Sequence, residues 1–360
     1  MTTEEVQEEG EGLDPRLEDG WQALEEGDIE TAREAVAACA KDDDESVRLE
    51  ALMLEAACER EDGDDAAAVK ALERAVLADP EWCTPELWLA ELLFDDSNGL
   101  TKALAHAARA VELAEEEDEY LAALNIKATI ELALGKPTEA RKTLKGLPAA
   151  DASLGDPDRA VDLAEVLIEA GDPAEAKERL EVVVAAEPGH ANAWYVLGVA
   201  AELTDDEARQ RSAWVKTREL DAAAAEHHQH EHGDHDHEHD HLTEEVLIEI
   251  AEETLADLPD EIRSLLANVP VIVAEFPAVA DVATGVDPRV LGLFNGTPHA
   301  DAGSTGGTPA LTEIVLFRAN IERVAHDEDE LRDEVATTLL HEAGHFFGLD
   351  EAALKRLGLD

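Results

Sequence analysis

Five residues late in the chain, His341-Glu342-Ala343-Gly344-His345, have the types and spacing of a metal hydrolase motif. Two histidines four positions apart on a helix lie on one face, one turn apart, so both imidazoles can reach a single ion. Neutral imidazole binds Zn²⁺ at about 2.0–2.1 Å. Glu342 is placed to accept a proton from a water molecule that the ion activates. The motif therefore predicts a zinc hydrolase, most simply one that cleaves peptide bonds, with Glu342 as its catalytic base.

A catalytic zinc ion takes a third protein ligand and keeps a fourth position open for water or substrate. Gly348 follows the motif and suits a left-handed turn that ends the helix and returns the chain toward the metal. Such a turn brings two carboxylates into reach. We expect Glu351 to be the third metal ligand, with Asp350 as the alternative.

The residues before the motif must form the helix that holds it. Residues 327–340 begin with acidic side chains, which favour a helix N-terminus. Leu331, Val335 and Leu339 then recur at helical spacing. Farther upstream, we expect a helix over 243–255 capped by Thr243, a helical region over 259–266, and strands at 269–273, 291–294 and 314–317.

These features together resemble one known family. Leu291-Gly292-Leu293-Phe294-Asn295-Gly296-Thr297-Pro298, Ile314 to Arg318 and the motif helix make residues from about 243 to 360 similar to the bacterial minimal zincin-like metallopeptidase family. The resemblance implies a small twisted sheet against the motif helix, with an edge strand that pairs with an extended substrate. Residues 311–318 are our candidate for that edge. Family members usually carry Asp at the last motif position, where this chain has Glu351.

The first part of the chain contains an internal repeat. Glycines recur every 36 residues, at Gly27, Gly63, Gly99, Gly135 and Gly171. The pattern around them resembles the tetratricopeptide repeat, a pair of antiparallel helices. We expect five repeats and a degenerate sixth near 191–222, stacked into an α-solenoid. Small residues five positions after four of these glycines should let paired helices approach closely: Ala32, Ala68, Ala140 and Ala176. Such arrays commonly bind peptides or proteins, although scaffolding or dimerisation would also suit one.

A histidine tract lies between the array and the motif-bearing segment. Its eight histidines alternate with acidic residues and are His227, His228, His230, His232, His235, His237, His239 and His241. Such a segment cannot pack a core, so we expect a disordered linker. The side chains are also candidate secondary ligands for zinc or nickel. A metal reservoir, a pH-sensitive linker and an inert spacer are the three interpretations.

Composition limits the classes of partner. The formal net charge of −58 argues against binding nucleic acid or an anionic membrane.

The sequence has neither a basic and apolar leader at its start nor an apolar run long enough to span a bilayer. Its three cysteines, Cys39, Cys58 and Cys83, are far apart and suit buried thiols in a reducing compartment. We therefore expect a cytoplasmic protein.

The sequence thus predicts a mostly α-helical chain: an α-solenoid followed by a small α+β domain. The expected parts are an acidic tail (1–14), a repeat array (15–222), a linker (223–242) and a zincin-like metallopeptidase domain (243–360). We expect a zinc-dependent peptidase whose array recruits a peptide or protein substrate or a protein partner. The alternative is a metal-handling or adaptor protein whose zinc site is structural or barely active.

Overall fold

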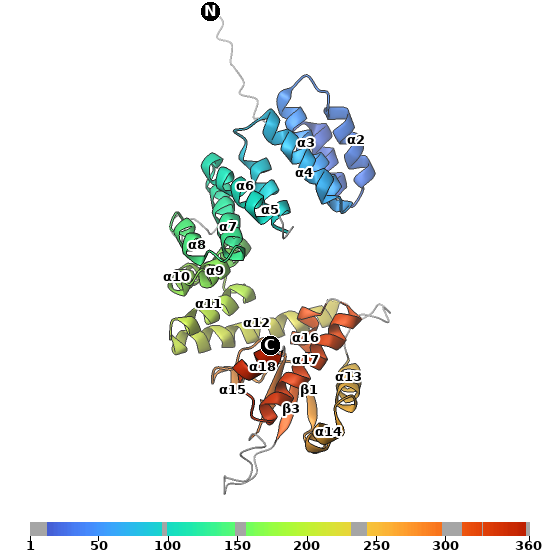
Figure 1. The fold of residues 1–360 in the computed structure, drawn as a ribbon, viewed down its shortest axis with the longest axis vertical. Helices are drawn as coiled ribbons and strands as arrows, with labels where there is room; N and C mark the ends of the chain where they lie inside the picture. Colours follow the sequence, from blue (N-terminus) through green and yellow to red (C-terminus); the bar gives the residue numbers. More distant parts are fainter. Residues whose placement is uncertain are drawn as a thin grey trace, which may run out of the picture. The chain divides into compact units, whose positions relative to one another are not determined.

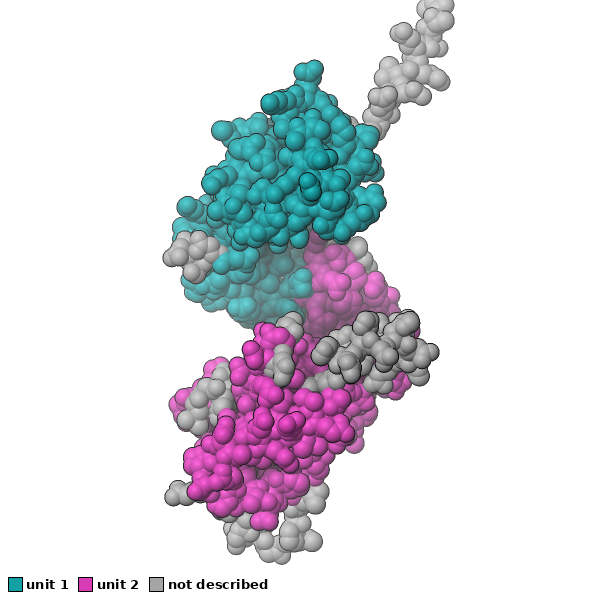
Figure 2. Space-filling view, turned by 90° about the vertical axis from the view of Figure 1, so that its right-hand side faces the viewer, with its two compact units in different colours: residues 1–152, 162–175 teal, residues 153–161, 176–360 magenta. Residues whose placement is uncertain are grey.

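The computed structural model describes residues 13–95, 99–147, 156–231, 243–296, 312–325 and 327–357. The described chain divides into two compact units, residues 1–152 with 162–175 and residues 153–161 with 176–360 (Figure 2). None of the described helices combines the length and the apolar character needed to cross a lipid bilayer.

The fold is mostly α-helical, as predicted, with one small sheet near the C-terminus (Figure 1). The predicted repeats appear as consecutive helices: α1 (Pro15–Glu25), α2 (Ile29–Cys39), α3 (Glu45–Glu61), α4 (Asp65–Ala78), α5 (Cys83–Asp95), α6 (Leu100–Leu113), α7 (Glu117–Ala133), α8 (Pro137–Leu144), α9 (Pro157–Glu169), α10 (Pro173–Ala186), α11 (Ala191–Leu203) and α12 (Glu207–Glu231).

A recurring turn joins the two helices of a repeat. Gly63 adopts a φ of 76°, a left-handed conformation that glycine tolerates because it lacks Cβ. Its N–H donates to the carbonyl of Arg60, and the N–H of Asp64 donates to the carbonyl of Glu59. Asp64 then caps α4, because its Oδ1 accepts the Ala67 N–H at 2.9 Å. The same few residues therefore end one helix and begin the next.

Burial agrees with two further predictions. The four alanines that follow the repeat glycines each have 0% exposure. Cys39, Cys58 and Cys83 are free and buried. Small side chains thus let the helices approach closely, and the cysteines act as small apolar residues in the core.

The second unit contains the sheet and the remaining helices. They are α13 (Glu244–Ala256), α14 (Asp260–Leu266), β1 (Val271–Ala274), α15 (Val279–Val282), β2 (Gly292–Asn295), β3 (Glu313–Phe317), α16 (Arg318–Val324), α17 (Glu328–Phe346) and α18 (Glu351–Leu357). Thr243 caps α13 as expected, with its Oγ1 accepting the Val246 N–H at 3.3 Å.

Strand order corrects one expectation. The order is β1-β3-β2, with β1 parallel and β2 antiparallel to β3. The segment that we expected at the edge, residues 311–318, contains β3, which is the central strand. Its apolar residues Ile314 and Leu316 are almost fully buried, consistent with neighbours on both sides. Among the described strands, β1 and β2 are therefore the outer ones.

One apolar cluster joins the sheet to the helices. Leu247 and Ile250 of α13 pack with Ile314 and Leu316 of β3, and α17 contributes Val335, Leu339, Ala343 and Phe346. This packing fixes α17 against the sheet, so the opposite face of the helix can carry polar residues. His341 and His345 lie on that more open face, with side chains 22% and 27% exposed.

Candidate metal centre

The motif lies at the C-terminal end of α17, as predicted from the sequence. Asp327 caps the start of this helix, where its Oδ1 accepts the N–H groups of Asp329 and Glu330. The helix ends after Phe346, and Gly348 adopts a φ of 83°. The chain then reverses into α18, whose first residue is Glu351.

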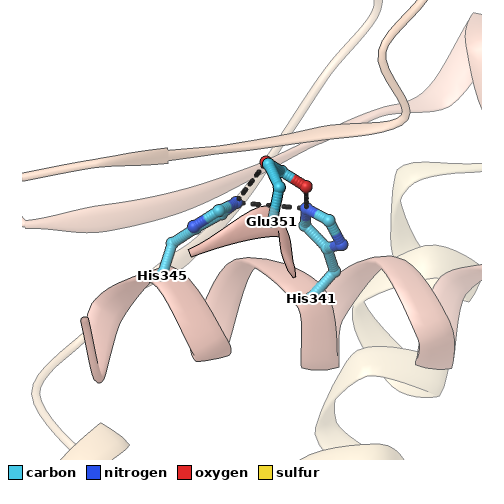
Figure 3. Close-up of side chains that lie close together, drawn as sticks. All are labelled: His341, His345 and Glu351. Atoms are coloured by element: carbon cyan, nitrogen blue, oxygen red, sulfur yellow. Dashed lines mark hydrogen bonds and ion pairs between the residues drawn. The ribbon is translucent and has the colours of Figure 1, made fainter. Parts of the chain in front are cut away.

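Because of this turn, the side chains of His341, His345 and Glu351 converge (Figure 3). Nε2 of His341 and Nε2 of His345 are 3.1 Å apart. The Glu351 carboxylate lies 3.2 Å from His345 Nε2 and 3.7 Å from His341 Nε2. Among the described residues, these three form a group that could hold a metal ion. Glu351 thus comes to the histidines from the next helix.

The arrangement fits a zinc ion. Ligand atoms bound at about 2.0–2.1 Å around a tetrahedral ion lie about 3.3 Å from one another. The separations between the three side chains, 3.1, 3.2 and 3.7 Å, are close to this value. Two imidazoles and a carboxylate are also a common donor set of catalytic zinc sites. With three protein ligands, a fourth position remains for water or substrate.

A backbone carbonyl orients one of the histidines. Nδ1 of His345 lies 3.1 Å from the carbonyl oxygen of Leu349. A carbonyl can only accept, so the proton of a neutral imidazole belongs on Nδ1 and the lone pair on Nε2. The turn that brings Glu351 back therefore also sets the tautomer that a metal ligand needs.

The other predicted ligands lie elsewhere. Asp350 Oδ1 accepts the Ala353 N–H at 2.8 Å, so this carboxylate faces the start of α18. In the histidine tract, α12 continues to Glu231, where we expected a disordered linker. His227, His228 and His230 are therefore on a helix. His232, His235, His237, His239 and His241 lie outside the described residues.

Glu342 is buried beside the site, between α17 and β2. It is 7% exposed, and the Phe294 N–H donates to its carboxylate. Burial raises the pKa of Glu342 above its usual value, while His341 and His345 offset part of that rise. A carboxyl group with a raised pKa holds a proton more readily, which suits a group that accepts one during catalysis.

Gly292 of β2 makes this approach possible. A Cβ at position 292 would lie 2.7 Å from Thr338 Cγ2 and 3.2 Å from Glu342 Cγ. Sequence reasoning missed the roles of Gly292, the Phe294 amide and the Leu349 carbonyl. The first two depend on how β2 packs against α17. The third is a main-chain atom that carries no residue signature.

Comparison with known families finds two matches in the chain. Residues 266–359 match the family described as Zincin-like metallopeptidase, and residues 161–225 match the family described as Tetratricopeptide repeat. A zincin-like segment therefore follows a repeat segment, as the sequence predicted. No curated protein matches the chain.

Solved structures resemble this chain at low identity. One is the MamA protein, at 20% identity over 49% of this chain and 94% of that chain, with a TM-score of 0.40. PilF of Pseudomonas aeruginosa matches at 14% identity over 61% of this chain and 96% of that chain, with a TM-score of 0.45. A tetratricopeptide repeat protein from Parabacteroides merdae matches at 13% identity over 70% of this chain and 96% of that chain, with a TM-score of 0.41.

Proposed function

We propose that the protein is a zinc-dependent peptidase and that His341, His345 and Glu351 hold the ion. The convergence of their ligand atoms beside the buried carboxylate of Glu342 is the observation that carries this proposal. A metal site that served structure alone would need no buried carboxylate next to it.

The residues divide the chemistry between them. A bound zinc ion supplies Lewis-acid chemistry, activating a water molecule and polarising the scissile carbonyl. Glu342 accepts a proton from the attacking water as the water oxygen bonds to the carbonyl carbon. Glu342 then returns the proton to the amine nitrogen as the C–N bond breaks. Leu349 keeps Nδ1 of His345 protonated, so that Nε2 stays available to the ion.

The repeat array gives the peptidase a means of recruitment. We propose that the array binds a protein partner or the substrate itself, because stacked helix pairs present a continuous surface suited to peptides and proteins. The choice of substrate would then depend on binding to the array as well as on the active site.

The decisive test replaces Glu342 with Gln in the full chain. The variant should retain one tightly bound zinc ion and lose nearly all hydrolysis of a peptide library, because the amide cannot accept the proton. Asp333→Asn, an acid-to-amide change at an exposed position of the same helix, is the matched control and should leave hydrolysis unchanged. Unaltered hydrolysis in Glu342→Gln would refute the assignment.

A second measurement separates the peptidase from a metal-handling or adaptor protein. A variant lacking residues 227–241 should still bind one tight zinc ion per chain, and that ion should disappear in His345→Ala. Zinc bound by the variant without turnover of any peptide in the library would favour the adaptor.

A further inference from the structure

The last helix pair of the array, α11 and α12, packs within the same compact unit as the zincin-like domain. Helix α12 contacts α15 directly (Figure 1). Arg218 of α12 donates through Nε to the carbonyl oxygen of Pro277 at 2.7 Å and lies over the ring of Phe276. This pair continues the repeat pattern of the array. It also has polar contacts with the domain that contains the sheet (residues 243–360), here called the sheet domain.

Asp221 of α12 is the centre of these contacts. Its side chain is 7% exposed and pairs with two arginines of the sheet domain. Arg289 Nε lies 3.3 Å from Asp221 Oδ2, and the Arg323 guanidinium lies 3.0 Å from the same oxygen. A buried carboxylate shared by two cations is costly to disturb, because removing it leaves both cations without their main counter-charge.

Helix α11 holds the same segment from its own side. Arg289 donates to Asn192 Oδ1 at 2.8 Å and lies over the ring of Tyr195, 4.4 Å from its centre. The Tyr195 hydroxyl donates to Asp287 Oδ2 at 3.1 Å. Asp287 and Arg289 flank Pro288 in a tight turn at 287–290. Helices α11 and α12 therefore bind the side chains on both sides of this proline.

The turn at 287–290 is followed directly by β2, the strand beside Glu342. Asn320 of α16, 1% exposed, donates to the carbonyls of Pro288 and Val290 at 2.9 and 2.7 Å. The next residue, Leu291, accepts the Phe317 N–H, and β2 begins at Gly292. β2 in turn supplies the Phe294 N–H that binds Glu342. From Asp221, through Arg289, to Glu342, the link runs through only six residues of main chain, 289–294.

We propose that α11 and α12 are an integral part of the peptidase unit and that Asp221 is a positioning residue for β2. By holding Arg289 and Arg323 together, Asp221 fixes the turn at 287–290 and hence the placement of β2 against α17. The catalytic consequence rests on the proposed function, whereas the structural link does not. The last repeat therefore belongs to the enzyme as much as to the array.

Hydrogen exchange of the full chain tests the link without relying on activity. Asp221→Ala should accelerate amide exchange in residues 287–296 by at least about tenfold, because local opening no longer breaks the buried ion pairs. Exchange in α3 and α4 should not change. The isosteric variant Asp221→Asn should show the same local effect and guards against failure of the alanine variant to fold. Glu226→Ala, which removes an exposed acid from the same helix, should exchange like the wild type.

Two results would overturn the proposal: unchanged exchange at 287–296, or acceleration spread evenly over the whole of residues 176–360. Kinetics provide a second readout. Asp221→Asn should lower kcat for peptide hydrolysis while one tight zinc ion stays bound, because β2 is displaced and the three ligands are not. Absence of hydrolysis in the wild type would refute the proposed function, and the exchange result would still decide this inference.

Discussion

Leu354 of α18 fills the space that a side chain at Gly344 of α17 would need, because an added Cβ would overlap Leu354 Cδ2. Leu354 has 0% exposure, so it cannot easily move aside. The glycine of the motif therefore sets how closely the two helices approach, and with it the position of Glu351.

Gly344→Ala should weaken zinc binding by about tenfold or more, because α18 must shift away and take Glu351 with it. Competition with a chromophoric chelator measures the affinity. Gly189→Ala is the control, since a Cβ there has no neighbour within 4 Å. Equal zinc affinity in the two variants would contradict the role given to Gly344.

Glu351→Ala should lower zinc affinity by more than about 100-fold, the upper range seen when only an outer-shell partner is lost. Asp350→Asn should bind zinc nearly as well as the wild type, because asparagine can still cap α18. The reverse ranking would identify Asp350 as the ligand. Metal titration of both variants under the same buffer and salt makes the comparison direct.

Zinc should stabilise the second unit against unfolding. At a free concentration 100 times its Kd, a ligand specific to the folded state adds about 2.7 kcal/mol to the free energy of unfolding. Thermal unfolding with zinc and with a chelator measures the difference. His345→Ala retains the histidine tract, so any stabilisation that persists in this variant must come from a site other than the one described.

The native thiols should resist alkylation. Burial raises the pKa of Cys83 to about 11. At pH 8, only about one thiol in a thousand with that pKa is ionised, and thiolate is the reactive form. Mass spectrometry should find native protein unlabelled under conditions that label all three cysteines after denaturation. Rapid labelling of Cys83 in the native chain would show that the start of α5, where Cys83 lies, opens readily.

Local features of the fold could be predicted from the sequence. The turn at Gly63 and Asp64 forms its bonds within a few residues, so periodicity alone places it. The spacing of His341 and His345 is likewise a property of one helix. Glu351 required one further assumption, a left-handed turn at Gly348, and that turn is present.

Long-range features could not be predicted in this way. The run of four apolar residues at 314–317 marks a strand but does not say which strands pair with it, so its central position was missed. The extension of α12 was also missed, because the acidic and histidine-rich composition hid the helix propensity of the preceding alanines, residues 222–225. The bonds of Asp221 join residues about 70 to 100 positions apart, a pairing that no local pattern encodes.

The self-contained turn at Gly63 and Asp64 has a consequence for how this chain could change over generations. Each such turn closes its own hydrogen bonds, so a whole 36-residue unit could be duplicated or lost with little effect on the turns of the units beside it. The final helix pair is different, because Asp221 and Tyr195 commit it to the sheet domain. Variation in array length among descendants of this gene should therefore fall before α11, with α11 and α12 inherited together with the metal-binding helix.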